Sequence, residues 1–209
     1  MIQFSCLTDV PGMTKGLVRE LRVRWMLEEL GLPHEAVIYS HPDTKKHPYL
    51  DLQPFGQVPY FKTDELQMFE TGAILIHLAL KYNKFLPTEE VARAHTLQWM
   101  FAAQTSVEPF LFHVFMLKFD PDAAESTKAR GRQICIDRVK ILSEKLGEKE
   151  YFSGEFSIAE IVMTTVLRTA NMSGLLDPHP NLVKYIQRLE ARPAYQRALA
   201  EHVKLYPEK

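Results

Sequence analysis

The hydrophobic pattern at the start of the chain changes from that of a strand to that of a helix and back. Residues 1–6 and 34–40 form short apolar runs, which predict two strands. Between them, apolar residues recur every three to four positions over residues 17–30, which predicts a helix. A crossover helix between two strands of one sheet predicts that the strands are parallel.

A second group of apolar runs follows a polar segment, residues 41–53, which predicts a loop or an irregular helix. Residues 58–63 and 66–69 flank an Asp-Glu pair and predict a β-hairpin. Residues 71–82 are almost continuously apolar and predict a buried helix. The order β-α-β and then β-β-α predicts a compact α/β domain over residues 1–82.

The pattern changes again after this domain. Residues 83–87 end in a proline and predict a linker, and residues 88–209 show helical spacing throughout. The chain is therefore expected to combine an α/β domain with an all-helical domain. Within the helical part, Ser157 and Glu160 have the spacing of a capping box, in which each side chain bonds the backbone N–H of the other residue.

Composition excludes several classes of partner. The 209 residues are 46% hydrophobic and 24% charged, and the formal net charge is −1. This charge gives no electrostatic reason to expect nucleic acid or an anionic membrane as a partner, and no apolar run is long enough to span a bilayer.

Cysteine and histidine usage adds two further expectations. Cys6 and Cys135 do not form a disulfide framework, and no export signal is visible, which favours a cytoplasmic location. The eight histidines show no metal-ligand spacing, so no metal site is expected.

Two pairs of residues are unusual for a segment that only builds a core. Proline cannot donate to a sheet, so Pro59 fits the first residue of a strand, where a cis Val58–Pro59 bond would make a tight turn. Glu70 and Thr71 open an apolar helix, whose N-terminus attracts carboxylates. A glutamate beside a bound anion suits a ligand that also carries an ammonium group. An ordinary trans proline and a plain helix cap are the alternatives.

Three segments carry a resemblance to a known family. Residues 55–79, "FGQVPYFKTDELQMFETGAILIHLA", residues 21–35, "LRVRWMLEELGLPHE", and residues 156–167, "FSIAEIVMTTVL", occur in the order found in the cytosolic, bacterial-type glutathione S-transferases. The resemblance implies a thioredoxin-like N-terminal domain followed by an all-helical C-terminal domain. It also implies glutathione as co-substrate, without a metal, and a homodimer.

The resemblance assigns roles to the two unusual pairs and their neighbours. It implies a cis Val58–Pro59 bond, with the backbone of Val58 pairing with the cysteinyl part of glutathione. Glu70 and Thr71 would hold the γ-glutamyl ammonium and carboxylate groups. The residues that would approach the glycine carboxylate are Gln57 and either Lys45 or Lys46.

The group that activates the glutathione thiol is less evident. The thiol pKa should lie near ~8.5, and lowering it by about two units needs roughly 2.7 kcal/mol of preferential thiolate stabilisation. The family uses a Tyr, Ser or Cys beside the first helix, whereas residues 16–20 contain none of these. The candidates are Thr14, which is equally suited to a cap; Ser5 and Cys6 at the end of a strand, where alternation would bury one of the two; and Arg19, which also fits a solvated helix face.

A second substrate is expected in an apolar pocket between the domains, against the helix that begins near Thr88. Helical spacing predicts its lining, although such a stripe also suits a core. The residues are Trp99, Met100, Ala103, Gln104, Ser106 and Phe110.

These observations favour an enzyme that joins glutathione to an apolar electrophile or reduces a peroxide with it. One alternative is a glutathione-binding carrier, similar to the ligandins, that lacks strong thiol activation. Another is a thiol transferase that depends on Cys6.

Overall fold

The structure is a computed structural model that describes residues 1–8, 10–14 and 16–206. It contains two compact units. The first comprises Met1–Lys84 together with the segment that begins at Ala191, and the second comprises Phe85–Glu190.

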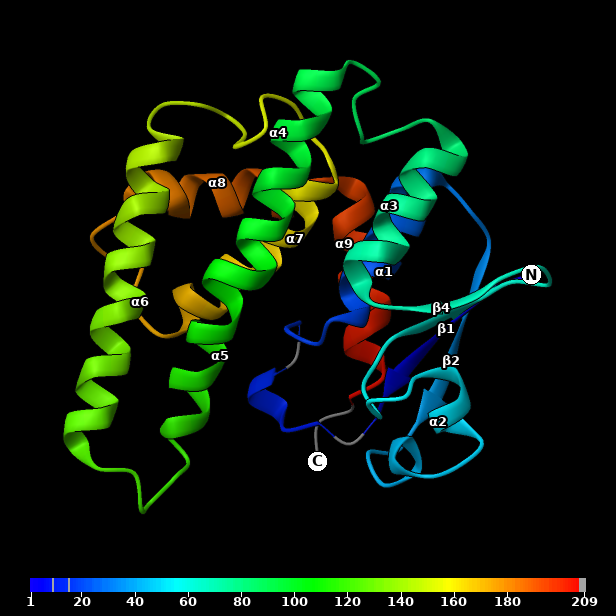
Figure 1. Cartoon of the computed structure of the whole chain (residues 1–209), viewed down its shortest axis with the longest axis horizontal. Helices are drawn as coiled ribbons and strands as arrows, with labels where there is room; N and C mark the ends of the chain where they lie inside the picture. Colours follow the sequence, from blue (N-terminus) through cyan, green and yellow to red (C-terminus); the bar gives the residue numbers. More distant parts are fainter. Residues whose placement is uncertain (9, 15, 207–209) are drawn as a thin grey trace. The chain divides into compact units, whose positions relative to one another are not determined.

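The first unit is built on a four-stranded sheet with the order β2-β1-β3-β4 (Figure 1). The bounds are β1 Ile2–Leu7, β2 His34–Tyr39, β3 Tyr60–Lys62 and β4 Gln67–Phe69. β1 pairs in parallel with β2, whereas β3 pairs antiparallel with both β1 and β4. The predicted parallel pair and hairpin are confirmed.

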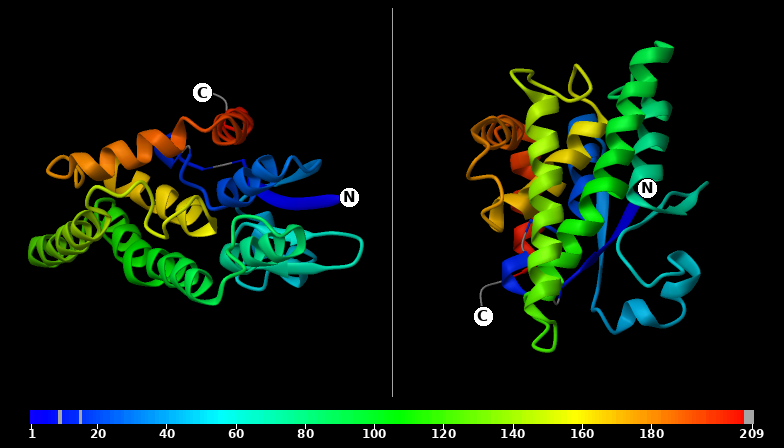
Figure 2. Two further views of the ribbon diagram at one scale, coloured as in Figure 1. Left: turned by 90° about the horizontal axis from the view of Figure 1, so that it is seen from above. Right: turned by 60° about the vertical axis from the view of Figure 1, so that its left-hand side comes forward.

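Helices α1 (Glu20–Leu30) and α3 (Thr71–Tyr82) pack against each other in this unit, and Figure 2 shows them side by side. α1 begins three residues later than the hydrophobic spacing suggested, because residues 17–19 form turns ahead of it. The predicted polar segment contains a 3-10 turn, Asp43–Lys45, and the short helix α2, Tyr49–Leu52.

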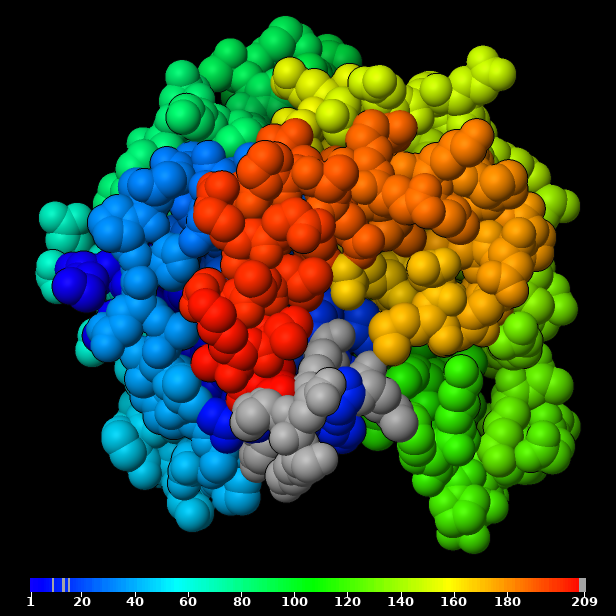
Figure 3. Space-filling model, turned by 180° about the vertical axis from the view of Figure 1, so that it is seen from behind, coloured from blue at the N-terminus to red at the C-terminus, as the bar shows by residue number. Residues whose placement is uncertain are grey.

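The segment from Ala191 belongs to the sheet-containing unit, although its helical pattern suggested the helical domain. Its helix α9 (Pro193–Lys204) packs on α1, with the Trp25 and Tyr195 rings 4.8 Å apart. Ion pairs add to this contact: the closest N–O distance is 2.6 Å for Arg192–Glu29 and 2.7 Å for Arg197–Glu28. Figure 3 shows α9, in red, at the surface beside the blue segments of the same unit.

The second unit consists of helices. α5 and α6 run side by side in it (Figure 2). Among the described residues, no helix is both long and apolar enough to cross a bilayer. The elements are α4 Glu90–Phe101, a π-helical turn Ala102–Val107, α5 Glu108–Leu117, α6 Glu125–Leu146, α7 Ile158–Met172 and α8 Pro180–Glu190.

The start of α7 is fixed by the two residues of the predicted capping box, although they do not pair as expected. The Ser157 side chain accepts a hydrogen bond from Ala159 N–H at 3.1 Å, as an N-cap should. The Glu160 carboxylate accepts instead from the Ser153 N–H at 2.9 Å and from the Tyr185 hydroxyl. Glu160 is fully buried and its pKa is raised by that burial. It therefore ties the preceding loop and α8 to the first turn of α7.

Replacing Ser157 by alanine is expected to lower the free energy of unfolding by about 1–2 kcal/mol, because the helix loses its cap. Urea unfolding followed by circular dichroism measures this change. Ser126→Ala is the matched control, since Ser126 lies exposed in α6. Equal midpoints for wild type and Ser157→Ala would show that the cap contributes nothing.

Candidate functional site

The two unusual pairs of the sequence lie at the open end of the β3–β4 hairpin. β3 and β4 pair Tyr60 with Phe69, so one step beyond the ladder the register brings Pro59 opposite Glu70. The Val58–Pro59 peptide bond is cis. The turn before β3 and the start of α3 therefore form a continuous strip of backbone.

Glu70 has a backbone conformation that few non-glycine residues adopt. It precedes α3 with φ 72° and ψ 112°, and its side chain makes no capping hydrogen bond. Such a conformation costs about 1–3 kcal/mol and occurs at ligand sites more often than elsewhere. The Glu70 side chain is exposed, while Thr71 beside it is buried. A helix N-terminus without a side-chain cap is suited to bind a carboxylate.

The main chain of Val58 is not used by the fold. No hydrogen bond joins its N–H or C=O to another of the described residues. Its side chain packs in a cluster with Tyr49 and Tyr60, against which Leu7 and Val18 are also packed. Val58 thus has a fixed position and unpaired backbone groups, as a peptide-binding residue requires.

Two hydrogen-bonded hydroxyl groups, those of Ser5 and Tyr49, fix the turn that precedes β3. The Ser5 Oγ accepts from Tyr60 N–H at 2.8 Å and lies 2.8 Å from the Tyr49 hydroxyl. Tyr49 donates its proton to the Gln57 carbonyl at 2.6 Å, so the hydrogen of Ser5 is donated to Tyr49. Burial raises the pKa of Tyr49 to about 12, which keeps it a donor. Ser5 is fully buried in this network and holds the turn rather than facing a ligand.

Tyr49 also belongs to this candidate site, although no sequence pattern marks it. It lies in a polar segment, and its role becomes visible only through its hydrogen bonds with Gln57 and with Ser5, which is 44 positions away.

Lys45 is the better placed of the two candidate lysines. Its Nζ donates to the carbonyl of Gly56 at 2.5 Å, directly before Gln57, whose side chain is exposed. Gly56 has φ +61°, and a Cβ there would lie 2.9 Å from the Lys45 side chain. Lys46 is exposed and lies 3.9 Å from the Asp43 carboxylate. The structure thus brings Lys45 and Gln57 together, and leaves Lys46 on the surface.

Thr14 and Arg19 both precede α1. The Thr14 hydroxyl donates to the Pro11 carbonyl at 2.7 Å, which closes a turn. Arg19 is half-buried at the N-cap position of α1 and makes no side-chain capping bond. The segment between them, Gly16–Arg19, leads directly into the helix, and its Val18 contacts the Val58 cluster.

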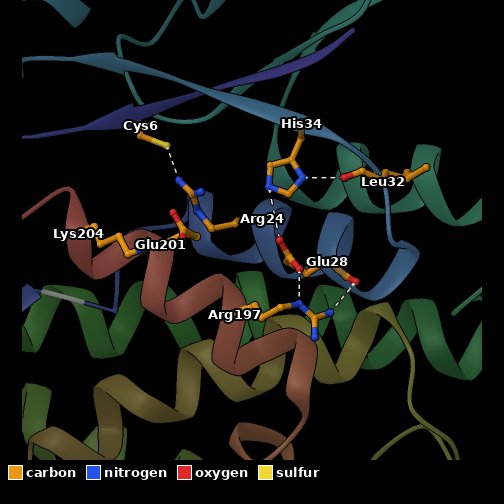
Figure 4. A network of polar contacts seen from close by, with 8 residues as sticks. All are labelled: Cys6, Arg24, Glu28, Leu32, His34, Arg197, Glu201 and Lys204. Atoms are coloured by element: carbon orange, nitrogen blue, oxygen red, sulfur yellow. Dashed lines mark hydrogen bonds and ion pairs between the residues drawn. The ribbon is translucent and has the colours of Figure 1, made fainter.

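Cys6 lies in the core of the unit. Its side chain is fully buried, and burial, reinforced by the negative charge of Glu20, raises the pKa of its thiol. An Arg24 Nη donates to its sulfur at 3.4 Å (Figure 4). Because the thiolate is the nucleophile, these surroundings argue against attack by Cys6.

A pocket of about 470 Å³ in the same unit has a lining of mixed polarity, to which Arg24, Glu28 and His34 contribute. Figure 4 shows these side chains with Glu201 and Lys204 of α9, which also line it. Two of its carboxylates form ion pairs, Glu28 with Arg197 and Glu201 with Lys204. Among the described residues, no group of three or more His, Cys, Asp or Glu side chains is arranged to hold a metal ion.

The predicted acceptor residues lie along α4, the π-helical turn and α5 of the helical unit. Met100 and Ala103 are fully buried in its core. Ser106 is exposed, whereas Gln104 is half-buried. The Trp99 ring lies 4.9 Å from Phe152, and the Phe110 ring lies beneath the Arg138 guanidinium at 3.7 Å.

Comparisons with known proteins agree with this geometry. The profile of the glutathione S-transferase N-terminal domain matches residues 15–80. Glutathione S-transferase 3 of Schizosaccharomyces pombe is 29% identical over 205 residues, covering 88% of this chain and 84% of that protein. Glutathione S-transferase GstB of Escherichia coli strain K12 is 28% identical, covering 85% of this chain and 91% of that protein.

One solved structure also has a related sequence. A glutathione transferase family member from Pseudomonas fluorescens, crystallised with two glutathione bound, superposes with a TM-score of 0.83 and 27% identity. The alignment covers 95% of this chain and 92% of that one.

The buried Cys6 thiol is expected to resist modification. In a Cys135→Ser variant, reaction of Cys6 with an aromatic disulfide reagent at pH 8 should be at least ~100-fold slower than for free cysteine. Stopped-flow absorbance measures this rate, and the same variant unfolded in urea is the control. Fast labelling of the folded protein would show that Cys6 is reactive.

Proposed function

We propose that this chain is a glutathione S-transferase, like the relatives that it resembles: it binds glutathione, activates the thiol and transfers it to an apolar electrophile or uses it to reduce a peroxide. The observation that carries this proposal is the strip in which Val58–Pro59 lies beside Glu70–Thr71. The strip offers unpaired backbone groups, a helix N-terminus and an exposed carboxylate.

In this proposal the charges of the tripeptide match the groups along the strip. The N-terminus of α3 and Thr71 hold the γ-glutamyl carboxylate, and Glu70 pairs with the ammonium group. The Val58 main chain bonds the cysteinyl unit. Lys45 and Gln57, with Lys46 further out, hold the glycine carboxylate. Glutathione is the co-substrate, and the chemistry needs no metal.

The thiol then faces the segment before α1. A helix N-terminus contributes up to about 2 kcal/mol toward a nearby anion, which is less than the roughly 2.7 kcal/mol needed. The difference is assigned to Thr14, to Arg19 or to the main-chain N–H groups of residues 18 and 19, because the N–H groups of Gly16 and Leu17 are donated to His202 and Thr14. Ser5 and Cys6 are not used, since both are fully buried.

The acceptor site, assembly and location follow the same family pattern. We assign the apolar acceptor to the helical unit, at Trp99, Gln104, Ser106 and Phe110, with Met100 and Ala103 as their support. We further propose a cytoplasmic homodimer that acts in detoxification.

One contact, the hydrogen bond from Thr14 to Pro11, favours a second candidate function, that of a glutathione carrier. The Thr14 hydroxyl is already donated to Pro11, so it is not free to stabilise a thiolate without a change of partner. A protein that holds glutathione without lowering its thiol pKa would be a carrier.

Titration of bound glutathione against pH tests the choice between these functions. The ultraviolet thiolate absorbance is expected to appear with a pKa about two units below the ~8.5 of free cysteine, because a stabilised thiolate forms at lower pH. Free glutathione is the control. Binding with an unshifted thiol pKa would support the carrier, and absence of binding would refute the glutathione site.

Replacing Glu70 by glutamine is expected to weaken glutathione binding by about 10–100-fold, because an ammonium ion loses its charged partner. Isothermal titration calorimetry gives the dissociation constant. Glu65→Gln is the matched control, since Glu65 is exposed in the turn of the same hairpin. If both variants bind as tightly as wild type, Glu70 does not contact the ligand.

A further inference from the structure

A buried polar pair joins α9 to the beginning of α1. Glu20 is the first residue of α1, His202 lies near the end of α9, and both side chains are completely inaccessible to solvent. The His202 Nδ1 is hydrogen-bonded to the Glu20 Oε1. On the other side of the ring, the Gly16 N–H donates to Nε2 at 2.9 Å.

These contacts fix the tautomer of His202. A backbone N–H only donates, so the Nε2 that accepts it carries no proton. The proton of a neutral imidazole must then lie on Nδ1, from which it is donated to Glu20. The carboxylate therefore selects the form of the ring that can accept from Gly16, in the same way that a neighbouring acceptor orients histidine ligands of metals.

The position of Gly16 determines where the chain enters α1. It has φ 79°, in the region that favours glycine, and it begins the four-residue segment Gly16–Arg19 that leads into α1. Val18 of this segment packs against the cluster that contains Val58. A displacement of Gly16 would therefore also move Val18, which packs against the strip that we assign to glutathione.

The packing of α9 on α1 does not depend on the Glu20–His202 pair alone. The contact already has the Trp25–Tyr195 ring pair and the ion pairs of Arg192 and Arg197 with α1. A buried charged or polar pair is often no more stabilising than apolar residues of the same size. Its specific effect here is the hydrogen bond that it directs to Gly16.

We propose that Glu20 and His202 are positioning residues for thiol activation. They hold the Gly16 amide and thereby keep residues 16–19 against Val58, where the sulfur of glutathione would lie. The inference rests on the proposed function for the role of the thiol. The arrangement of Gly16, His202 and Glu20 is independent of any ligand.

Nitrogen NMR of the unliganded protein tests that arrangement first. The ring nitrogens of His202 are expected to show a proton on Nδ1 and none on Nε2, and the Gly16 amide is expected to exchange slowly with solvent. Glu20→Gln removes the charge that selects the tautomer and should speed the exchange of Gly16 by about tenfold. A proton on Nε2, or rapid exchange of Gly16 in the wild type, would overturn the proposal.

Kinetics with glutathione and an aryl halide electrophile then test the role in activation. His202→Leu should raise the pKa of the bound thiol and lower kcat by about tenfold, with little change in glutathione affinity. His202→Gln, which keeps a donor and an acceptor, should restore part of this loss. The matched control is Arg197→Gln, which breaks an α9–α1 ion pair without touching Gly16.

The outcomes separate the possible causes. Equal losses in Arg197→Gln and His202→Leu would show that His202 only docks α9, which overturns the proposal. If His202→Leu does not fold, the milder variants Glu20→Gln and His202→Gln decide the question. Each should still speed the exchange of the Gly16 amide and lower kcat, and wild-type values in both variants would overturn the proposal. If wild type binds no glutathione, the proposed function fails, while the NMR result still decides whether His202 holds Gly16.

Discussion

The register of the β3–β4 hairpin is the constraint on which the candidate site depends. Side chains alternate between the faces of a sheet, so a slip of one residue would turn Phe61 out of the core and separate Pro59 from Glu70. The register does not rest on the two short strands alone. Ser5 in β1 binds Tyr60, and Tyr49 bridges Ser5 and Gln57, so hydroxyl groups from two other elements fix the start of β3. Among the described residues, none makes a hydrogen bond to the main chain of Val58, which lies directly before this fixed point.

Much of the first unit could be predicted because its signals are local. The parallel strands, the hairpin and the bounds of α3 follow from apolar spacing and turn residues within a few positions. The start of α1 was placed too early because Leu17 continues the helical spacing, although Gly16 and the turns that follow it delay the helix until Glu20. A reciprocal cap was expected of Glu160, but its buried carboxylate accepts instead from Ser153 in the preceding loop and from the distant Tyr185 in α8.

The parts of the site that escaped prediction depend on contacts between residues far apart in the chain. Tyr49 and Ser5 are separated by 44 positions, and Glu20 and His202 by 182. No short pattern marks them, since a tyrosine in a polar loop and a histidine in an amphipathic helix are both ordinary. The grouping of α9 with the sheet was missed for the same reason. The amphipathic pattern of α9 predicts only that one face of the helix is buried. Which unit it packs on is determined by the complementary surface of α1.

The first unit is built from two segments that are far apart in the chain, Met1–Lys84 and the segment from Ala191. This affects the order in which its parts can fold during synthesis. Domains on a ribosome usually fold as they emerge, beginning from the N-terminal side. Here the sheet, α1 and α3 emerge early, but the helix that covers Trp25 and binds Glu20 follows the whole helical unit in the chain. During synthesis the face of α1 that packs against α9 therefore stays uncovered until α9 has been made. The unit that carries the strip of Val58–Pro59 and Glu70–Thr71 is thus the first to begin folding, and it is completed only after the helical unit has been made.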